Sequence, residues 1–212
     1  MNRIIWISAA VCYGLFLSWY FNWSGPLNGQ EIDKAMAAFE ASTGSEYTDL
    51  DDLRAFLEAD DGEEFVMANL VRLHQEDVLH PVSGDVMPPA TVVGEYFQPF
   101  MKAMFLRGGH PVYHARIRGG YIDSWHVDAD PRFGIAAMVR YRSRRDMVEL
   151  LANPIFSEMH VYKFAAIEKT ASFPTQIMSS TFLQPKYWVP GLLLLLASLA
   201  QNVALLPGRT RT

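Results

Sequence analysis

Two arginines and a histidine occupy positions at which they could share one face of a sheet. His114 and Arg116 alternate along a segment with strand-like patterning, residues 112–118, and Arg140 lies in the apolar run 135–141. Side chains two positions apart on a strand point to the same face. A cleft containing all three groups would suit an anionic or enolic ligand. The alternative is that the arginines lie at the surface or in a dimer interface, where charged side chains are more common.

Asn69 and His160 are two further candidates for a site. Asn69 interrupts the apolar row on one face of the segment 65–73, where an unpaired buried amide would cost about 1–3 kcal/mol. This amide would bind a substrate carbonyl or phenol, or it would satisfy a backbone group at the sheet edge, which is the commoner arrangement. His160 lies in a short helical segment and would serve either as a proton donor and acceptor or as a structural histidine with satisfied hydrogen bonds.

The sequence contains no recognised cofactor-binding or metal-binding motif. The chain has no glycine-rich phosphate loop, no His-Glu-x-x-His and no Cys-x-x-Cys, and its single cysteine, Cys12, excludes an intrachain disulfide. Two groups of side chains have the right types for metal ligands, but both fall in loops whose composition is equally typical of solvated turns. These groups are His74, Glu76, Asp77 and His80, and His126, Asp128 and Asp130. We therefore predict no cofactor and no metal, and the catalytic residues stay unassigned.

Apolar patterning defines the elements that must position these residues. Residues 65–73 and 135–141 are near-continuous apolar runs of strand length, and both contain the pattern Ala-x-apolar-Val-Arg. A helix and a returning strand follow each run, which predicts a βαββαβ unit with a four-stranded antiparallel sheet and two helices on one face. The expected elements are a strand at 65–73, a helix capped by Thr91 and interrupted at Pro99, a strand at 112–118, a strand at 135–141, a helix capped by Ser143, and a strand at 164–168.

Two uncharged apolar runs flank this unit, at residues 4–23 and 187–208. Each is long enough to span a hydrocarbon layer of about 30 Å as a helix. The first run ends in aromatic residues rather than in a cleavage site of small residues, so a retained anchor is favoured over a cleaved signal peptide. Arg3, Arg209 and Arg211 lie outside the runs, which favours cytoplasmic termini and a periplasmic central domain.

The segment between the two runs is acidic. It holds all 23 acidic residues and 15 of the 18 basic ones, a formal charge of −8, which makes nucleic acid an unsuitable partner. Amphipathic helices are expected at 30–41 and after a cap at Thr48. The predicted organisation is a transmembrane helix at 1–23, a helical linker at 24–62, the α+β domain at 63–170, a connector at 171–186 and a second transmembrane helix at 187–208.

Several short motifs resemble those of a widespread bacterial family of unknown function in the dimeric α+β-barrel superfamily. They are the Asn69-Leu70 strand, the Gly108-Gly109 junction, the passage Val139-Arg140-Tyr141-x-Ser143 and Asn153-Pro154. The resemblance covers about residues 52–170 and implies a ferredoxin-like domain that pairs with a second copy. The chain departs from the family in its terminal apolar helices, and in Tyr162 and Lys163, where the family favours a His-Arg pair. The superfamily includes cofactor-independent monooxygenases and isomerases, so the likeness implies a fold rather than a reaction.

Two functions follow from these observations. The first is a membrane-anchored accessory or interaction subunit, whose sheet docks on itself or on a partner protein because a bare apolar sheet face needs cover. The second is a cofactor-independent enzyme, monooxygenase-like or isomerase-like, acting on lipophilic, ring-containing substrates. Its site would use the candidates His114, Arg116, Asn69, Arg140 and His160. A row of aromatic residues and methionines would line its pocket, although the simpler interpretation of this row is a helix packed against the sheet: Tyr96, Phe97, Phe100, Met101, Met104 and Phe105.

Overall fold

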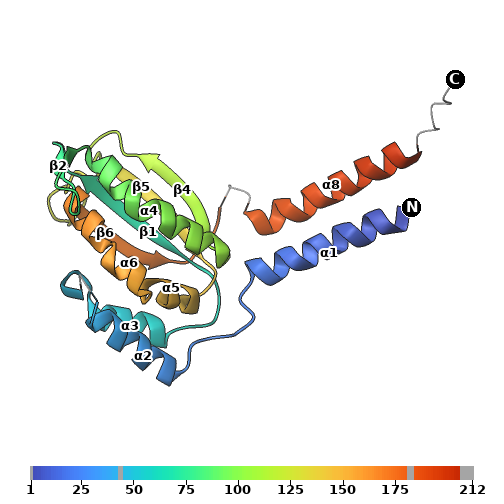
Figure 1. Ribbon diagram of the computed structural model, residues 1–212, viewed down its shortest axis with the longest axis horizontal. Coiled ribbons are helices and arrows are strands. Elements are labelled where there is room, and N and C mark those ends of the chain that lie inside the picture. The colour runs from blue at the N-terminus through green and yellow to red at the C-terminus, as the bar shows by residue number, and fades with distance from the viewer. Residues whose placement is uncertain (1, 43–44, 181–183, 206–212) are drawn as a thin grey trace. The chain divides into compact units, whose positions relative to one another are not determined.

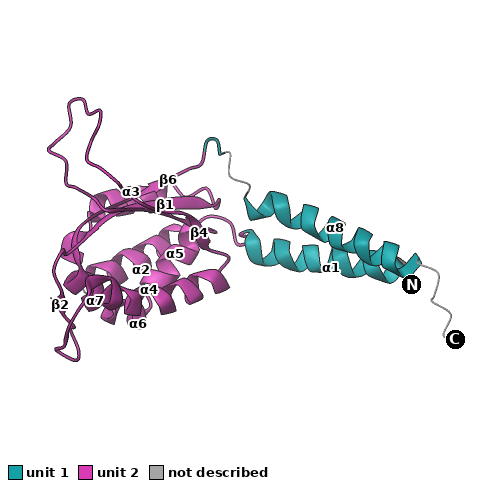
Figure 2. Ribbon diagram, turned by 90° about the horizontal axis from the view of Figure 1, so that it is seen from above, with its two compact units in different colours: residues 1–21, 178–212 teal, residues 22–177 magenta. Residues whose placement is uncertain are grey.

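The computed structural model describes residues 2–42, 45–180 and 184–205. The chain forms two compact units, one containing residues 22–177 and the other containing the terminal helices (Figures 1 and 2). The larger unit is a mixed α+β domain, as predicted. Residues 24–62, expected to be a linker, belong to this unit and contribute to its core.

A four-stranded antiparallel sheet forms the centre of the larger unit. Its strands are β1 (Phe65–Leu73), β4 (His110–Arg116), β5 (Ile135–Tyr141) and β6 (Ile167–Thr175). They lie in the order β4-β5-β1-β6, so β1 and β5 are central and β4 and β6 are the edges. The central strands are the two apolar runs of the sequence, and Phe65 of β1 and Tyr141 of β5 belong to the main core cluster. A separate two-stranded hairpin contains β2 (Val78–Leu79) and β3 (Val86–Met87).

Helices cover one face of the sheet through a shared core (Figure 2). They are α2 (Gly29–Glu40), α3 (Leu50–Glu58), α4 (Pro89–Leu106), α5 (Arg144–Leu151), α6 (Pro154–Glu158) and α7 (His160–Ala166), with a short 3₁₀ turn at Ser45–Tyr47. Phe65 of β1 stacks on Tyr141 of β5, with ring centroids 5.2 Å apart, and both belong to the main cluster. Since paired residues in a ladder share a face, these two residues identify the covered side of the sheet.

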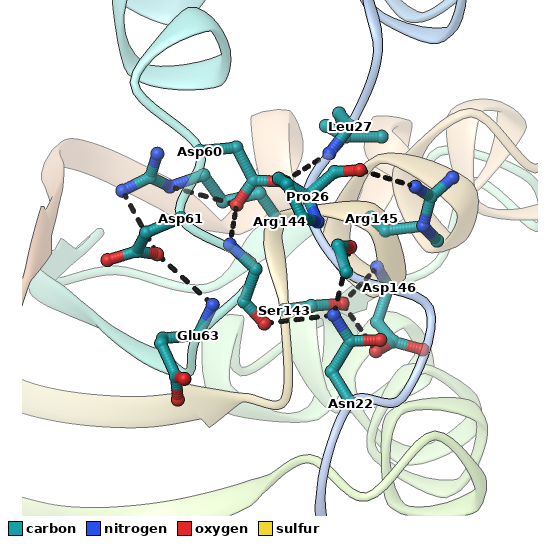
Figure 3. Close-up of polar contacts among 12 residues, drawn as sticks. Asn22, Pro26, Leu27, Asp60, Asp61, Glu63, Ser143, Arg144, Arg145 and Asp146 are labelled. Carbon is teal, nitrogen blue, oxygen red and sulfur yellow. Dashed lines mark hydrogen bonds and ion pairs between the residues drawn. The ribbon is translucent and has the colours of Figure 1, made fainter.

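Local signals explain where most helices begin. Ser143 caps α5 by accepting a hydrogen bond from the Asp146 amide at 3.1 Å, as the sequence predicted (Figure 3). The cap of α3 is Asp49 rather than Thr48, because the Asp49 carboxylate accepts from the amides of Asp51 and Asp52. Pro99 does not interrupt α4, which runs through it to Leu106.

The expected last strand is present, but its predicted bounds, 164–168, are wrong. Helix α7 continues to Ala166, and β6 then runs from Ile167 to Thr175, well beyond the predicted domain end at residue 170. Ala166 is fully buried against Val92 of α4, and this tertiary contact stabilises a short helix that apolar patterning alone does not reveal. The second strand also lies earlier than 112–118, at His110–Arg116. It includes Pro111, which an edge strand tolerates.

The second unit is a pair of antiparallel helices, α1 (Asn2–Tyr20) and α8 (Pro185–Leu205) (Figure 2). Both are long and apolar enough to cross a membrane. The predicted spans were shifted by a few residues, and residues 206–208 of the second span lie outside the described part of the chain. The indole N–H of Trp6 donates a hydrogen bond to the Gln201 side chain, so this amide has a partner on the neighbouring helix.

Candidate functional site

Strand register places the candidate residues on two different faces of the sheet. The covered face carries Phe65, Asn69 and Tyr141, and the opposite side is called the open face below. Its members alternate with those of the covered face along each strand. They are Val66, Ala68 and Leu70 of β1, Ala136, Met138 and Arg140 of β5, Tyr113 and Ala115 of β4, and Ala171, Phe173 and Thr175 of β6.

Arg140 is a buried structural residue on the open face. Its side chain is 3% exposed, and its Nε and Nη2 atoms lie 2.7 and 2.6 Å from the Glu64 carboxylate. Nη1 donates to the carbonyl of Gly108, at the turn that leads into β4. Its ladder partner is His110, whose pKa is lowered chiefly by burial. The guanidinium therefore ties three chain segments together, and its hydrogen-bonding capacity is directed at the protein rather than at a ligand.

His114 and Arg116 do not lie with Arg140. The register of β4 shifts between Pro111 and Tyr113, so that one extra residue is inserted opposite β5. Beyond this bulge His114 pairs with Ala137, which places it and Arg116 on the face opposite to Arg140. Both side chains are exposed on the edge strand. The predicted cleft of three basic groups is therefore not formed.

Asn69 has its hydrogen bonds within the sheet. Its amide donates to the carbonyl of Met67 at 3.1 Å and of Ala137 at 3.4 Å, and its carbonyl accepts from the Ser172 hydroxyl at 2.8 Å. The second of the two alternatives, in which the side chain satisfies backbone groups, describes this arrangement.

His160 lies in a cluster of three titratable side chains, with Tyr96 and Lys163. Its Nε2 atom is 3.5 Å from the hydroxyl of Tyr96, and the Lys163 ammonium lies 5.1 Å from the centre of the Tyr96 ring. Burial raises the pKa of Tyr96 and lowers the pKa of Lys163. A lysine that loses its proton more readily than usual is suited to proton transfer, whereas a phenol that keeps its proton is suited to donating a hydrogen bond. The aromatic side chains of Phe97 and Phe164 lie beside the cluster and are partly exposed.

The loop residues considered as metal ligands are not gathered into a cluster. Among the described residues no group of three or more His, Cys, Asp or Glu side chains is placed to hold a metal ion. His80 instead organises the β2–β3 hairpin, where its Nδ1 accepts from the amides of Val82 and Ser83 and its Nε2 lies 3.2 Å from Glu95. Asp130 closes the loop between β4 and β5, as described below. His74, Glu76, Asp77, His126 and Asp128 belong to neither arrangement.

The open face is largely apolar, and large side chains on three of its four strands are partly exposed. Tyr113, Met138 and Phe173 are 41%, 39% and 48% exposed, and each lies on a different strand. The smaller side chains between them are alanines and Leu70. None of these three large side chains is among the candidates that the sequence indicates. The sequence shows the alternation of side chains along each strand, but it does not show which face of the sheet the helices cover.

Comparisons with known proteins give the fold and no activity. No protein-family model matches the sequence, and neither does any curated protein. Two crystal structures of one protein, RPA0582 of unknown function from Rhodopseudomonas palustris, match the structure. The first has 18% identity and a TM-score of 0.50, and the match covers 61% of this chain and 94% of that chain. The second, of the methylated protein, has 19% identity and a TM-score of 0.51, and it covers 62% and 93%.

Proposed function

We propose that the chain is a two-pass membrane protein whose ferredoxin-like domain is an interaction module. In this proposal α1 and α8 anchor the chain in a bilayer, and the domain docks through its open face on a second copy of the chain. A membrane complex built in this way would use the chain as an accessory or scaffolding subunit rather than as a catalyst.

The ferredoxin-like assignment is supported by the order of elements and strands. Leaving aside the small β2–β3 hairpin, the domain runs β1, α4, β4, β5, then α5 to α7, then β6. The sheet order β4-β5-β1-β6, with every pair antiparallel, is the order expected when each half of a βαββαβ unit contributes one central and one edge strand.

Membrane anchoring is supported by the terminal helices. Many of their large apolar side chains are exposed, including Ile4, Leu15 and Leu199 at 67%, 65% and 51%. A helical pair in water would hide such residues, whereas lipid accepts them. The proposed orientation has both termini in the cytoplasm and the domain in the periplasm, from the arginines that flank the outer helix ends.

The observation that carries the docking function is the apolar open face. Exposed apolar surface of several hundred Å² on a folded domain typically marks an interaction site. Two ionic groups at the margins of this face are paired within the domain, Arg140 with Glu64 and Arg72 with Glu168 at 2.7 Å, and Lys169, the ladder partner of Arg72, is exposed beside them. The centre of the face is thus apolar and charge is confined to its margin, which suits apposition to a similar surface.

A charge placed at the centre of the open face tests this proposal. Met138→Glu, in the full chain in mild detergent, should convert a dimer to a monomer in sedimentation equilibrium or native mass spectrometry. Ile155→Glu is the matched control, because Ile155 is 62% exposed on α6, on the helical side of the sheet. A wild-type chain that is monomeric at all concentrations would refute self-docking. A stoichiometric second protein lost on Met138→Glu would replace the second copy as the occupant.

The Tyr96–His160–Lys163 cluster favours a second candidate function, a cofactor-independent acid–base enzyme. Partly exposed aromatic side chains beside a buried proton-transfer group would suit ring-containing, lipophilic substrates such as phenols or quinols. Turnover of a phenol or quinol panel should then be lost in His160→Ala and Lys163→Met chains that keep the wild-type melting temperature. Absence of turnover across the panel, or turnover unchanged in both variants, would remove this candidate.

A further inference from the structure

The connection between β4 and β5, residues 117–134, is a long loop with an apolar tip. Connections in compact domains are usually about 4–6 residues, and longer ones without regular structure are commonly functional. Figure 2 shows this loop standing away from the sheet on the side opposite to α4, α6 and α7, which is the side of the open face. Four of its apolar side chains are exposed, namely Tyr121 at 52%, Ile122 at 101%, Trp125 at 76% and Val127 at 61%.

Hydrogen bonds and an ion pair hold the base of the loop in place. Asp130 accepts hydrogen bonds from the amides of Tyr121 at 2.9 Å and Arg132 at 2.7 Å, and its carboxylate lies 3.4 Å from the Arg132 guanidinium. A Cβ at Gly120 would come to 2.5 Å from the side-chain ends of Asp130 and Arg132, so a larger residue there would push these two side chains out of their present contacts. Ile117 adds a backbone hydrogen bond to Gly134 at 2.9 Å. The loop is therefore held at its base while its tip extends into solvent.

The area of the open face indicates why a projecting tip would matter. Strands β1 and β5 pair from Phe65 to Val71, and four strands of that length give a footprint of at most about 450 Å², within which Val66, Ala68 and Arg140 are already buried. A stable protein interface buries roughly 800 Å² on each partner. At the exposures above, Tyr121 and Trp125 add about 250 Å², and Ile122 and Val127 add more. The sheet and the loop tip together approach the required area, whereas the sheet alone does not.

We propose that the loop tip is an arm that packs against a second copy of this chain, extending the contact made by the open face. This inference rests on the self-docking function proposed above. A second copy is favoured over a bilayer because Asp123 and Asp128 lie within the tip, and acidic groups are repelled by anionic lipid surfaces. The Trp125 indole N–H is already bonded to Asp123, so this side chain offers an apolar ring without an unsatisfied donor.

Dimer dissociation of a tip variant tests the arm. Ile122→Ser in the full chain in detergent should raise the dimer dissociation constant about tenfold or more, because a fully exposed isoleucine is lost from the interface. Ile155→Ser, which removes an exposed isoleucine from α6, should leave it unchanged. Equal dissociation constants for the two variants, with the dimer intact, would refute the arm and leave self-docking standing. A monomeric wild type would refute both.

A photo-crosslinker at the tip tests where the arm lands. Benzoylphenylalanine replacing Trp125, in an equal mixture of ¹⁴N- and ¹⁵N-labelled chains, should give mixed-label crosslinks that map to β1, β4, β5 or β6. The melting temperature should equal that of the wild type, since the tip contributes no buried residue to its own domain. Crosslinks that are confined to one chain, to lipid or detergent, or to an unrelated protein would overturn the proposal.

Discussion

Removing the Arg140 side chain tests whether it is a structural residue, as its contacts indicate, or a ligand-binding group. Arg140→Ala leaves the Glu64 carboxylate, 24% exposed, without its cation and leaves the Gly108 carbonyl without its donor. Removing one partner of a buried ion pair costs about 3–5 kcal/mol. For a domain the size of residues 22–177, each kcal/mol lowers the melting temperature by about 2–4 °C. The expected fall is therefore about 6–20 °C.

The assay is thermal unfolding of the full chain in mild detergent, followed by near-ultraviolet circular dichroism. The double variant Glu64→Gln with Arg140→Met should regain part of the loss, because it leaves no unpaired buried charge. Arg132→Ala is the control, since this guanidinium is 70% exposed and its pair with Asp130 is worth no more than about 1 kcal/mol. An Arg140→Ala chain that melts within 2 °C (about 1 kcal/mol or less) of the wild type would refute the structural role and return Arg140 to the list of candidate binding groups.

Three further outcomes follow from the same contacts. Asp146→Ala removes the carboxylate that pairs with Arg142 and accepts from the Ser143 hydroxyl at 2.7 Å, and it should cost about 1–3 kcal/mol in chemical unfolding. The hydrogen bond from the Arg132 amide lowers the pKa of Asp130, so the loop base should be intact above about pH 5 and should loosen as the pH falls below about 4. The measurement is the rate of proteolysis at residues 117–134, which should rise at low pH. A cleavage rate independent of pH would contradict this prediction. Gln201→Leu removes the bond from Trp6 and should shift the tryptophan emission of the helix pair, whereas Ser198→Leu should not.

The sequence by itself determined the elements whose signals are local. The strand at 65–73 and the strand at 135–141 have the predicted bounds, because each is an apolar run of strand length. Ser143 begins its helix through its own side chain, and the terminal apolar helices follow from length and composition. Each of these features depends on neighbours within a few residues along the chain, and so the sequence contains the whole cause.

Only the tertiary structure decided how the candidate residues are grouped. One extra residue in β4, between Pro111 and Tyr113, turns His114 away from the face of Arg140, and the alternation of apolar and polar residues at 112–118 did not predict this bulge. The partner of Arg140 is Glu64, more than seventy residues away in the chain. The association of Tyr96 with His160 likewise depends on α4 and α7 packing together. Strand register and helix packing are set by contacts between segments that are distant in the sequence. Which candidate residues lie together is therefore decided by these tertiary contacts and not by the local sequence.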